Sequence, residues 1–231
     1  MIVTIDGPAG AGKSTAARAL ARILGFDFLD TGAMFRAVAL AALRAGVALT
    51  DEAGLSRLLA DVRLEMADGC VSLDGEDVSG HIRTPEISAA SSVVAASAVV
   101  RPRLAALQRR IVAGRDFVCE GRDQGTVVFP DAGCKFFLTA DAEERLHRRA
   151  GDLRSRGATV EIDALRGEQA ERDHRDSHRE LAPLRPAADA ILVDSTGRTF
   201  EEVVSLMEGE VRRRSANAPS RVVGIEGGES Q

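Results

Sequence analysis

Residues 1–25 read MIVTIDGPAGAGKSTAARALARILG, and this stretch decides the fold. Its first part, residues 2–5, is a β-branched run of the kind that forms a buried parallel strand. Residues 7–14 then fit the pattern G-x-x-x-x-G-K-[ST] at every fixed position. From Thr15 onward apolar residues recur at helical spacing until Gly25 supplies a stop signal. Strand, glycine loop and helix therefore follow one another in the order that a phosphate-binding loop requires.

The residue types of this loop suit a nucleoside triphosphate. Glycines let successive backbone N–H groups turn toward one centre, and the positive end of the following helix adds to that field. Lys13 is expected to reach the β- and γ-phosphates, and the Ser14 hydroxyl suits a Mg²⁺ ligand. A glycine turn before an ordinary helix is the alternative, which the complete pattern disfavours. The residues expected to bind ATP are Gly7, Pro8, Ala9, Gly10, Ala11, Gly12, Lys13, Ser14 and Thr15.

Composition limits the class of protein. A chain of 231 residues with 45% hydrophobic and 28% charged residues is typical of a soluble globular protein with one good-sized core. The net charge of −5 argues against a nucleic-acid surface, and no apolar run reaches transmembrane length. Cys70, Cys119 and Cys134 lack a C-x-x-C pairing, so we expect buried free thiols in a reducing cytoplasm.

Strand and helix patterns alternate along most of the chain and predict an α/β fold with a parallel sheet flanked by helices. Residues 62–75 interrupt this order, because alternation broken by two Asp-Gly turns indicates a small antiparallel meander. We therefore expect a core of residues 1–49 and 113–214, an inserted small α+β lobe over 50–112, a helical lid over 147–175 and a disordered tail over 215–231.

Local signals predict several helix ends. Thr50 is expected to cap a helix over residues 51–59, and Thr199 with Glu202 forms a capping box for the last helix. Arg101 directly precedes Pro102, which biases its backbone away from the helical conformation.

A densely basic segment is the second strong clue. Residues 145–156 and four later arginines suit a mobile lid over the phosphate loop, since phosphoryl transfer spreads negative charge and requires that water be excluded. Gly151 and Gly157 are expected to break this segment. A solvated, salt-bridged helical pair is the alternative, whereas nucleic-acid binding is disfavoured because aromatic residues make up only 3% of the chain. The later arginines are Arg166, Arg172, Arg175 and Arg179.

Other charged residues are candidate ligands. Arg36, in the first turns of a helix, suits a second phosphorylated molecule, although a solvated arginine fits its spacing equally well. Residues 121–123 follow a buried strand and so lie at the carboxyl edge of the sheet, where α/β proteins bind ligands, and Glu120 is placed to position Mg²⁺-bound water. His174 and His178 lie four apart but lack further zinc ligands of suitable spacing.

Taken together, the chain resembles the bacterial-type cytidylate kinases, a family of nucleoside monophosphate kinases. The resemblance extends from residue 2 to about residue 213 and rests on the separated blocks 5–14, 29–36, 75–83, 120–131 and 172–184. It implies transfer of the γ-phosphate of ATP to CMP or dCMP with Mg²⁺, a parallel core sheet, a monophosphate-binding insertion and a lid. It also implies small-molecule substrates with no nucleic-acid or membrane partner, and we expect a monomer.

The resemblance also assigns residues. Lys13, Arg36 and Arg122 are the expected catalytic residues, and the two arginines hold the CMP phosphate. Ala9 and Phe35 depart from the commoner serine and tyrosine of the family. The full set of residues expected to bind CMP is Thr31, Arg36, Ser92, Arg101, Arg122, Asp123, Arg172, Asp176 and Arg179, of which Ser92, Arg101 and Asp123 face the cytosine and the last three engage the sugar and phosphates.

Two other classes of protein share parts of this pattern. An adenylate- or shikimate-type kinase would have the loop and the lid, but would not need the inserted meander. A regulatory P-loop ATPase would bind nucleotide and need a partner surface in place of a second substrate pocket. The arginines beyond the loop count against the regulatory ATPase.

Overall fold

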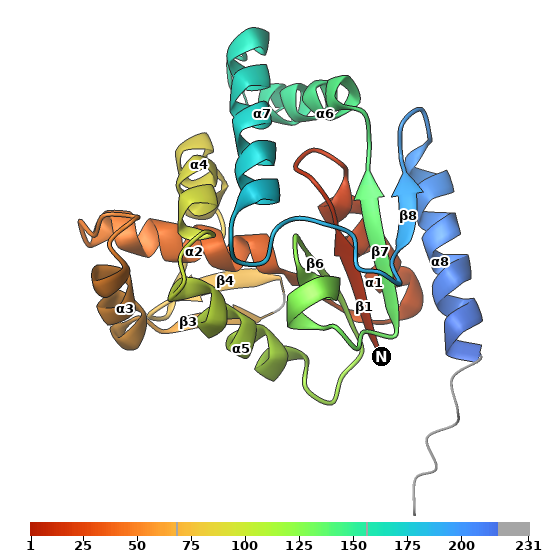
Figure 1. Ribbon diagram of the computed structural model, residues 1–231, viewed down its shortest axis with the longest axis horizontal. Coiled ribbons are helices and arrows are strands. Elements are labelled where there is room, and N and C mark those ends of the chain that lie inside the picture. Colours follow the sequence, from red (N-terminus) through yellow and green to blue (C-terminus); the bar gives the residue numbers. More distant parts are fainter. Residues whose placement is uncertain (68, 156, 217–231) are drawn as a thin grey trace, which may run out of the picture.

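The computed structural model describes residues 1–67, 69–155 and 157–216. Its centre is a five-stranded sheet of order β2-β6-β1-β7-β8, in which every neighbouring pair is parallel (Figure 1). The β-branched sequence of β1, IVTID, suits this central position, because a parallel sheet is covered on both faces. The predicted α/β fold is confirmed. The strands are β1 (Ile2–Asp6), β2 (Asp27–Asp30), β6 (Phe117–Gly121), β7 (Cys134–Thr139) and β8 (Ile191–Asp194).

Helices pack on both faces of this sheet. Val118 of β6 belongs to an apolar cluster with α1 (Lys13–Leu24) and α8 (Phe200–Ala216). Its neighbour Cys119 belongs to a second cluster with α2 (Thr31–Arg44) and the helices of the 50–112 region. Adjacent residues of a strand point to opposite faces, so these two clusters are the cores of the two sides of the sheet.

The 50–112 region carries a separate three-stranded antiparallel sheet of order β3-β4-β5. Asp74 and Gly75 connect β4 to β5 with φ values of 51° and 87°, and a type I′ hairpin turn requires positive φ at both positions. The predicted antiparallel meander is confirmed. The elements of the region are α3 (Glu52–Asp61), β3 (Leu64–Ala67), β4 (Cys70–Leu73), β5 (Glu76–Asp77), η1 (His81–Arg83), α4 (Pro85–Val94) and α5 (Val100–Val112).

Three further helical segments surround the carboxyl edge of the parallel sheet. The π-helical segment η2 (Gln124–Val128) follows β6 directly. The helices α6 (Ala142–Ser155) and α7 (Ile162–His178) stand above this edge, with a small apolar cluster of Leu146, Ala150 and Leu165 between them (Figure 1). Gly151 lies inside α6, so the prediction that it breaks the segment is wrong, because one glycine costs a helix only about 1 kcal/mol.

Two predicted helix ends differ from the structure. The cap of α3 is Asp51 rather than Thr50, because the Asp51 carboxylate accepts the Gly54 N–H at 3.0 Å. The prediction that residues 215–216 belong to a tail is wrong, since α8 continues to Ala216. The rest of the predicted tail, 217–231, lies outside the described residues. The capping box of Thr199 and Glu202 is confirmed, with reciprocal bonds of 2.8 and 3.2 Å.

Arg101 lies inside a helix, contrary to the expectation from Pro102. The helix α5 begins at Val100, so Pro102 stands in its first turn. The N–H groups of a first turn have no partner within the helix, and a proline there loses no hydrogen bond. From this position the Arg101 guanidinium reaches Asp123, which follows β6.

The cysteines fit the expectation in part. Cys119 and Cys134 are buried free thiols, whereas Cys70 is exposed at the start of β4, so its predicted burial is wrong. Among the described residues, no helix is both long and apolar enough to cross a membrane.

Candidate active site

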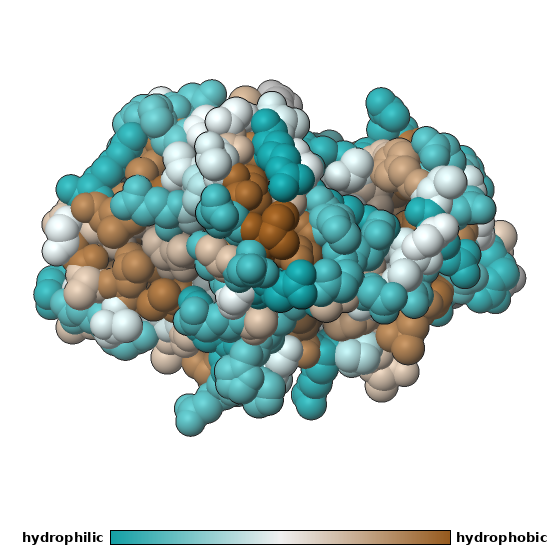
Figure 2. All heavy atoms as spheres, turned by 90° about the horizontal axis from the view of Figure 1, so that it is seen from above, coloured by the Kyte–Doolittle hydropathy of each residue, from teal (hydrophilic) through white to brown (hydrophobic). Residues whose placement is uncertain are grey.

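A cavity of about 890 Å³ lies at the carboxyl edge of the parallel sheet. It runs from the phosphate loop and the ends of β2 and β6 to the helices α4, α5 and α7. Hydrophilic side chains predominate on the face of the molecule seen from the side of α6 and α7 (Figure 2). In open α/β sheets ligands bind at this edge, which makes the cavity the candidate active site.

The glycines shape the phosphate loop. Gly10 and Gly12 have φ values of 77° and 86°, which L side chains rarely adopt, and Gly12 is the cap of α1. A Cβ at Gly10 would lie 2.8 Å from the carbonyl oxygen of Arg145, so α6 packs directly on the loop. Of the predicted ATP contacts, residues 9–15 line the cavity, whereas Gly7 and Pro8 do not.

Lys13 is the charged residue of this loop. It is buried, and its Nζ donates a hydrogen bond to the carbonyl oxygen of Pro8 at 2.6 Å. Burial, with the charge of Arg122 nearby, lowers the pKa of Lys13 to about 7. An anion placed in the loop would relieve this cost, because its negative charge favours the ammonium form.

Oxygen atoms suited to metal coordination lie beside Lys13. Glu120 is buried in β6. Burial together with the charge of Asp30 raises the pKa of Glu120, whereas Lys13 and a hydrogen bond from Ser14 lower it. Ser14 is exposed in the cavity. Hydroxyl and carboxylate oxygens are the ligands that Mg²⁺ prefers, so this group fits a magnesium ion that also contacts phosphate. No group of three or more His, Cys, Asp or Glu suited to a metal occurs in the part of the chain that the structure describes.

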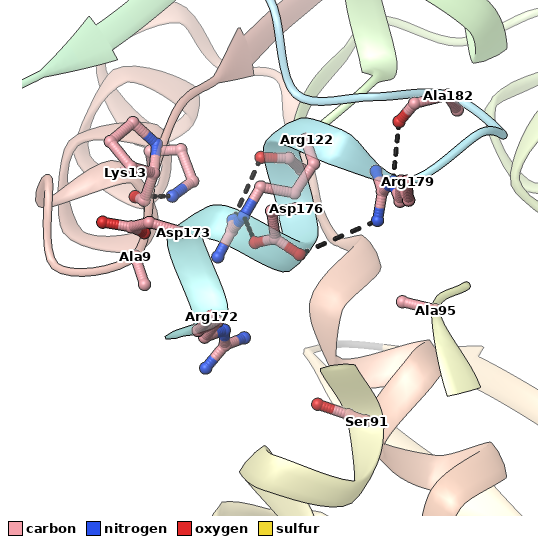
Figure 3. Close-up of polar contacts among 12 residues, drawn as sticks. Ala9, Lys13, Ser91, Ala95, Arg122, Arg172, Asp173, Asp176, Arg179 and Ala182 are labelled. Carbon is pink, nitrogen blue, oxygen red and sulfur yellow. Dashed lines mark hydrogen bonds and ion pairs between the residues drawn. The ribbon is translucent and has the colours of Figure 1, made fainter. Parts of the chain in front are cut away.

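Across the cavity, arginines are held by carboxylates. Arg122 donates from Nε to Asp176 at 2.9 Å, and Arg179 lies 3.8 Å from the same carboxylate (Figure 3). Arg36 pairs with Asp30 at 3.1 Å. Carboxylates therefore fix the directions in which these guanidinium groups point before any ligand is bound.

Several arginine nitrogens in this cluster have no hydrogen-bond partner within the described residues. They are buried N–H groups of Arg36, Arg172 and Arg179. Burial and the charge of Arg122 lower the pKa of Arg172 to about 9, and burial and Arg101 lower that of Arg179 to about 10. Burying unpaired donors is costly, so the arrangement is suited to an anion that accepts from several of them.

A polar pocket adjoins the arginines. Arg101 forms a buried ion pair with Asp123, donates to the Ala95 carbonyl at 2.7 Å, and has its Cζ 5.5 Å from the centre of the Phe35 ring. The Ser92 hydroxyl is buried and has no hydrogen-bond partner among the described residues. The Asp123 carboxylate, the Arg101 guanidinium and the Ser92 hydroxyl thus line one pocket. Such a pocket suits a planar base with several hydrogen-bonding atoms.

The structure brings every residue predicted for CMP to this cavity. The Thr31 hydroxyl, however, donates to the Glu120 carbonyl at 2.6 Å and is committed to the fold. His174 and His178 stack with ring centres 4.1 Å apart on α7 and do not line the cavity. The lining residues predicted for CMP are Thr31, Arg36, Ser92, Arg101, Arg122, Asp123, Arg172, Asp176 and Arg179.

Sequence reasoning missed other residues of the cavity. Ser88 accepts a hydrogen bond from Arg172 at 3.0 Å and so joins the 50–112 region to α7. Arg148 donates to the hydroxyl and carbonyl oxygens of Ser195 at 2.8 and 2.9 Å, near the phosphate loop. No local motif marks Ser88 or Ser195, because their role depends on contacts between distant segments.

A phosphate loop on a parallel sheet, facing paired arginines across one cavity, defines a P-loop kinase. A sequence model described as cytidylate kinase matches residues 3–213. Cytidylate kinase of Geobacter sulfurreducens is 51% identical over 95% of this chain and 96% of its own length, and that of Rhodopirellula baltica is 45% identical over 95% and 98%. The chain belongs to the cytidylate kinase family.

Solved structures agree on the fold. An uncharacterized protein from Eubacterium ventriosum superposes with a TM-score of 0.53 at 11% identity, over 92% of this chain and 98% of that one. A gluconokinase from Sinorhizobium meliloti gives 0.51 at 17% identity, over 93% of each chain. At such low identity these likenesses support the α/β kinase fold alone.

Proposed function

We propose that this protein is an ATP-dependent nucleoside monophosphate kinase that transfers the γ-phosphate of ATP to CMP or dCMP, giving ADP and CDP or dCDP. Family membership supports this reaction. The observation that carries it is the opposition, in one cavity, of the phosphate loop and the unpartnered arginine donors. An ATPase without a second substrate would have no use for that second anion site.

The donor triphosphate is assigned to residues 7–15. Backbone N–H groups of the loop and the amino end of α1 bind the phosphates, and Lys13 stabilises the charge of the migrating group. Ser14 would hold Mg²⁺, which would supply further neutralisation of the phosphate charge. These contacts orient the γ-phosphate toward the arginines.

The acceptor phosphate is assigned to Arg36 and Arg122, with Arg172 and Arg179 adding donors from α7 and its end. They approach from three parts of the fold, α2, the end of β6 and α7, so together they suit an anion placed between them. Asp176, which holds Arg122, lies where a ribose hydroxyl could donate to it. The catalytic set we propose is Lys13, Arg36 and Arg122.

The cytosine is assigned to the pocket of Ser92, Arg101 and Asp123. Cytosine carries an amino donor beside two ring acceptors, and the pocket offers carboxylate and hydroxyl acceptors beside a guanidinium donor. Phe35 under Arg101 adds an apolar wall.

We propose that residues 50–112 act as a monophosphate-binding lobe and residues 147–175 as a lid. The lobe supplies Ser92 and Arg101 to the cavity, and the lid supplies Arg148, Arg149 and Arg172. The small apolar cluster between α6 and α7 suits a segment that moves when substrate binds.

We also propose that the protein acts as a monomer in the cytoplasm. All the residues assigned to the two substrates come from one chain. The free cysteines suit a reducing compartment, in which ATP and CMP are also found.

A coupled assay of ADP release against a panel of acceptors tests the proposal. CMP and dCMP should be phosphorylated at least about tenfold more efficiently than UMP, AMP or shikimate, because their bases satisfy the buried polar groups. Preference for AMP or shikimate, or ADP release that needs no acceptor, would overturn it.

A further inference from the structure

Asp6 does not line the cavity, but it lies next to two segments that do: the phosphate loop and the Arg122–Asp123 segment. It is the last residue of β1 and is 4% exposed. Its two carboxylate oxygens accept the backbone N–H groups of Gln124 and Gly125, at 2.8 and 2.7 Å. One side chain thus joins the strand that precedes the phosphate loop to the segment that follows β6.

The segment held in this way begins directly after Arg122 and Asp123. The first N–H groups of a helical segment have no partner inside it, and η2 begins at Gln124. Asp6 supplies acceptors for two of them from a distant strand, and Val127 and Val128 donate back to the Asp123 carbonyl. Asp6 therefore fixes where the chain turns away after β6 and how the Arg122–Asp123 segment between β6 and η2 is held.

The side chain of Asp6 is not what fixes the phosphate loop. The backbone of Asp6 is held in the sheet between Gly121 of β6 and Phe137 of β7. Removing the carboxylate leaves this backbone pairing in place. We therefore expect its loss to disturb the Arg122–Asp123 segment more than the loop at residues 7–14.

The segment has little room to shift. A Cβ at Gly125 would lie 2.9 Å from the Thr4 hydroxyl and 3.4 Å from Asp6 Oδ2. The glycine thus allows the backbone to approach β1 closely enough for its N–H to reach the carboxylate. A substituent at this position would push the segment away from Asp6 without changing any charge.

The environment of Asp6 shifts the pKa of its carboxyl group into a range that can be measured on the folded protein. Burial raises its pKa to about 6, with Asp123 adding to the shift and the two backbone donors and Lys13 opposing it. The Cys119 thiol of β6 also interacts with it, and the Lys135 side chain of β7 lies 3.2 Å from where a Gly125 Cβ would be. Protonation below pH 6 would remove negative charge from the bonds to η2.

We infer that Asp6 is a positioning residue for the acceptor half of the site, holding the Arg122–Asp123 segment through the Gln124 and Gly125 N–H groups. The inference rests on the proposed function, since it assigns that segment to CMP. Asp6 acts through the backbone it holds and contacts neither substrate.

The test compares Asp6→Asn with wild type. An amide keeps the shape but loses the charge and presents a donor to one N–H, so KM for CMP should rise by roughly tenfold, as for loss of a charge-assisted bond. The Kd of a non-hydrolysable ATP analogue should change less than about twofold. Asp51→Asn is the matched control: it replaces another carboxylate that accepts a helix N–H, outside the cavity, and should leave both constants unchanged.

Equal losses for CMP and the ATP analogue, or no loss, would overturn the inference. If Asp6→Asn fails to fold, Gly125→Ala decides, because it should produce the same selective rise in KM for CMP; an unselective effect of Gly125→Ala would contradict the inference.

A further measurement does not depend on turnover. The amide proton shifts of Gln124 and Gly125 should titrate with a midpoint near pH 6, following Asp6. If the two amide shifts do not titrate near pH 6, the contact with Asp6 is refuted. If they titrate but the enzyme does not phosphorylate CMP, only the proposed function is refuted.

Discussion

The two halves of the cavity are built in different ways. The half that we assign to the phosphate donor is lined by one continuous run of sequence, residues 9–15, whose shape depends on backbone groups and glycine conformations. The acceptor half collects side chains from α2, α4, α5, the end of β6 and α7, and orients them with Asp30, Asp123 and Asp176. Local sequence therefore specifies the donor half, whereas tertiary contacts specify the acceptor half. Mutations in the two halves of the cavity should therefore have different effects.

The largest effect is expected in the donor half. Lys13→Ala should lower kcat by about 10²–10³, since a preorganised charge at the migrating phosphoryl is typically worth that much. The fold should persist, because the substitution removes a buried ammonium group whose pKa burial has lowered. Steady-state kinetics and circular dichroism check this. Near-normal turnover in a folded variant would contradict it.

In the acceptor half, the main effect of Asp176→Asn should be a lower free energy of unfolding rather than a lower kcat. The amide leaves Arg122 and Arg179 without their carboxylate, at a cost of about 1–3 kcal/mol. The folded pKa of Asp176 is lowered, because its arginine partners outweigh burial, so its stabilisation is present above the unfolded pKa and is lost as the pH falls through the folded one.

Urea denaturation at pH 7 and at pH 3 measures this. The difference in free energy of unfolding between wild type and Asp176→Asn should shrink at pH 3, and adding CMP at pH 7 should stabilise both proteins. A difference that does not depend on pH would contradict the account.

A smaller effect is expected on the choice of base. Arg101 already pairs with Asp123, so uracil would not leave this carboxylate without a donor, but it would set its O4 acceptor against an acceptor. Asp123→Asn offers a donor amide instead, and the ratio of kcat/KM for CMP to that for UMP should fall by about tenfold. An unchanged ratio would mean that Asp123 does not face the base.

The smallest effect is a change in protection of the proposed lid. Hydrogen exchange in α6 and α7 should slow when an ATP analogue and CMP are both bound, since their phosphates supply acceptors for Arg172. The strands β1 and β6 should change little and serve as the internal control. Equal protection with and without ligands would argue against closure.

The same contrast explains what the sequence could predict. The phosphate loop was predictable because its pattern is contiguous and its geometry is dictated by glycine. The sequence pattern placed Arg122 at the carboxyl edge of the sheet, Arg36 early in a helix and Arg172 in the lid. Their joint binding of CMP followed only from resemblance to a family, since nothing in their spacing fixes it.

Individual contacts between distant segments were not predictable. The pairing of Arg101 with Asp123 was missed because the two lie on different elements, and the bias of Pro102 pointed the wrong way. The bond from Arg172 to Ser88 and the hold of Asp6 on Gln124 likewise depend on packing.

The central claim is that one cavity binds ATP at the phosphate loop and CMP at the arginines. A bisubstrate dinucleotide, with adenosine and cytidine joined by a pentaphosphate chain, tests it most directly through inhibition kinetics. The account predicts competition with both ATP and CMP, and affinity at least about 10²-fold above that of CMP, because joining two ligands makes the second binding event intramolecular. Competition with only one substrate would contradict it.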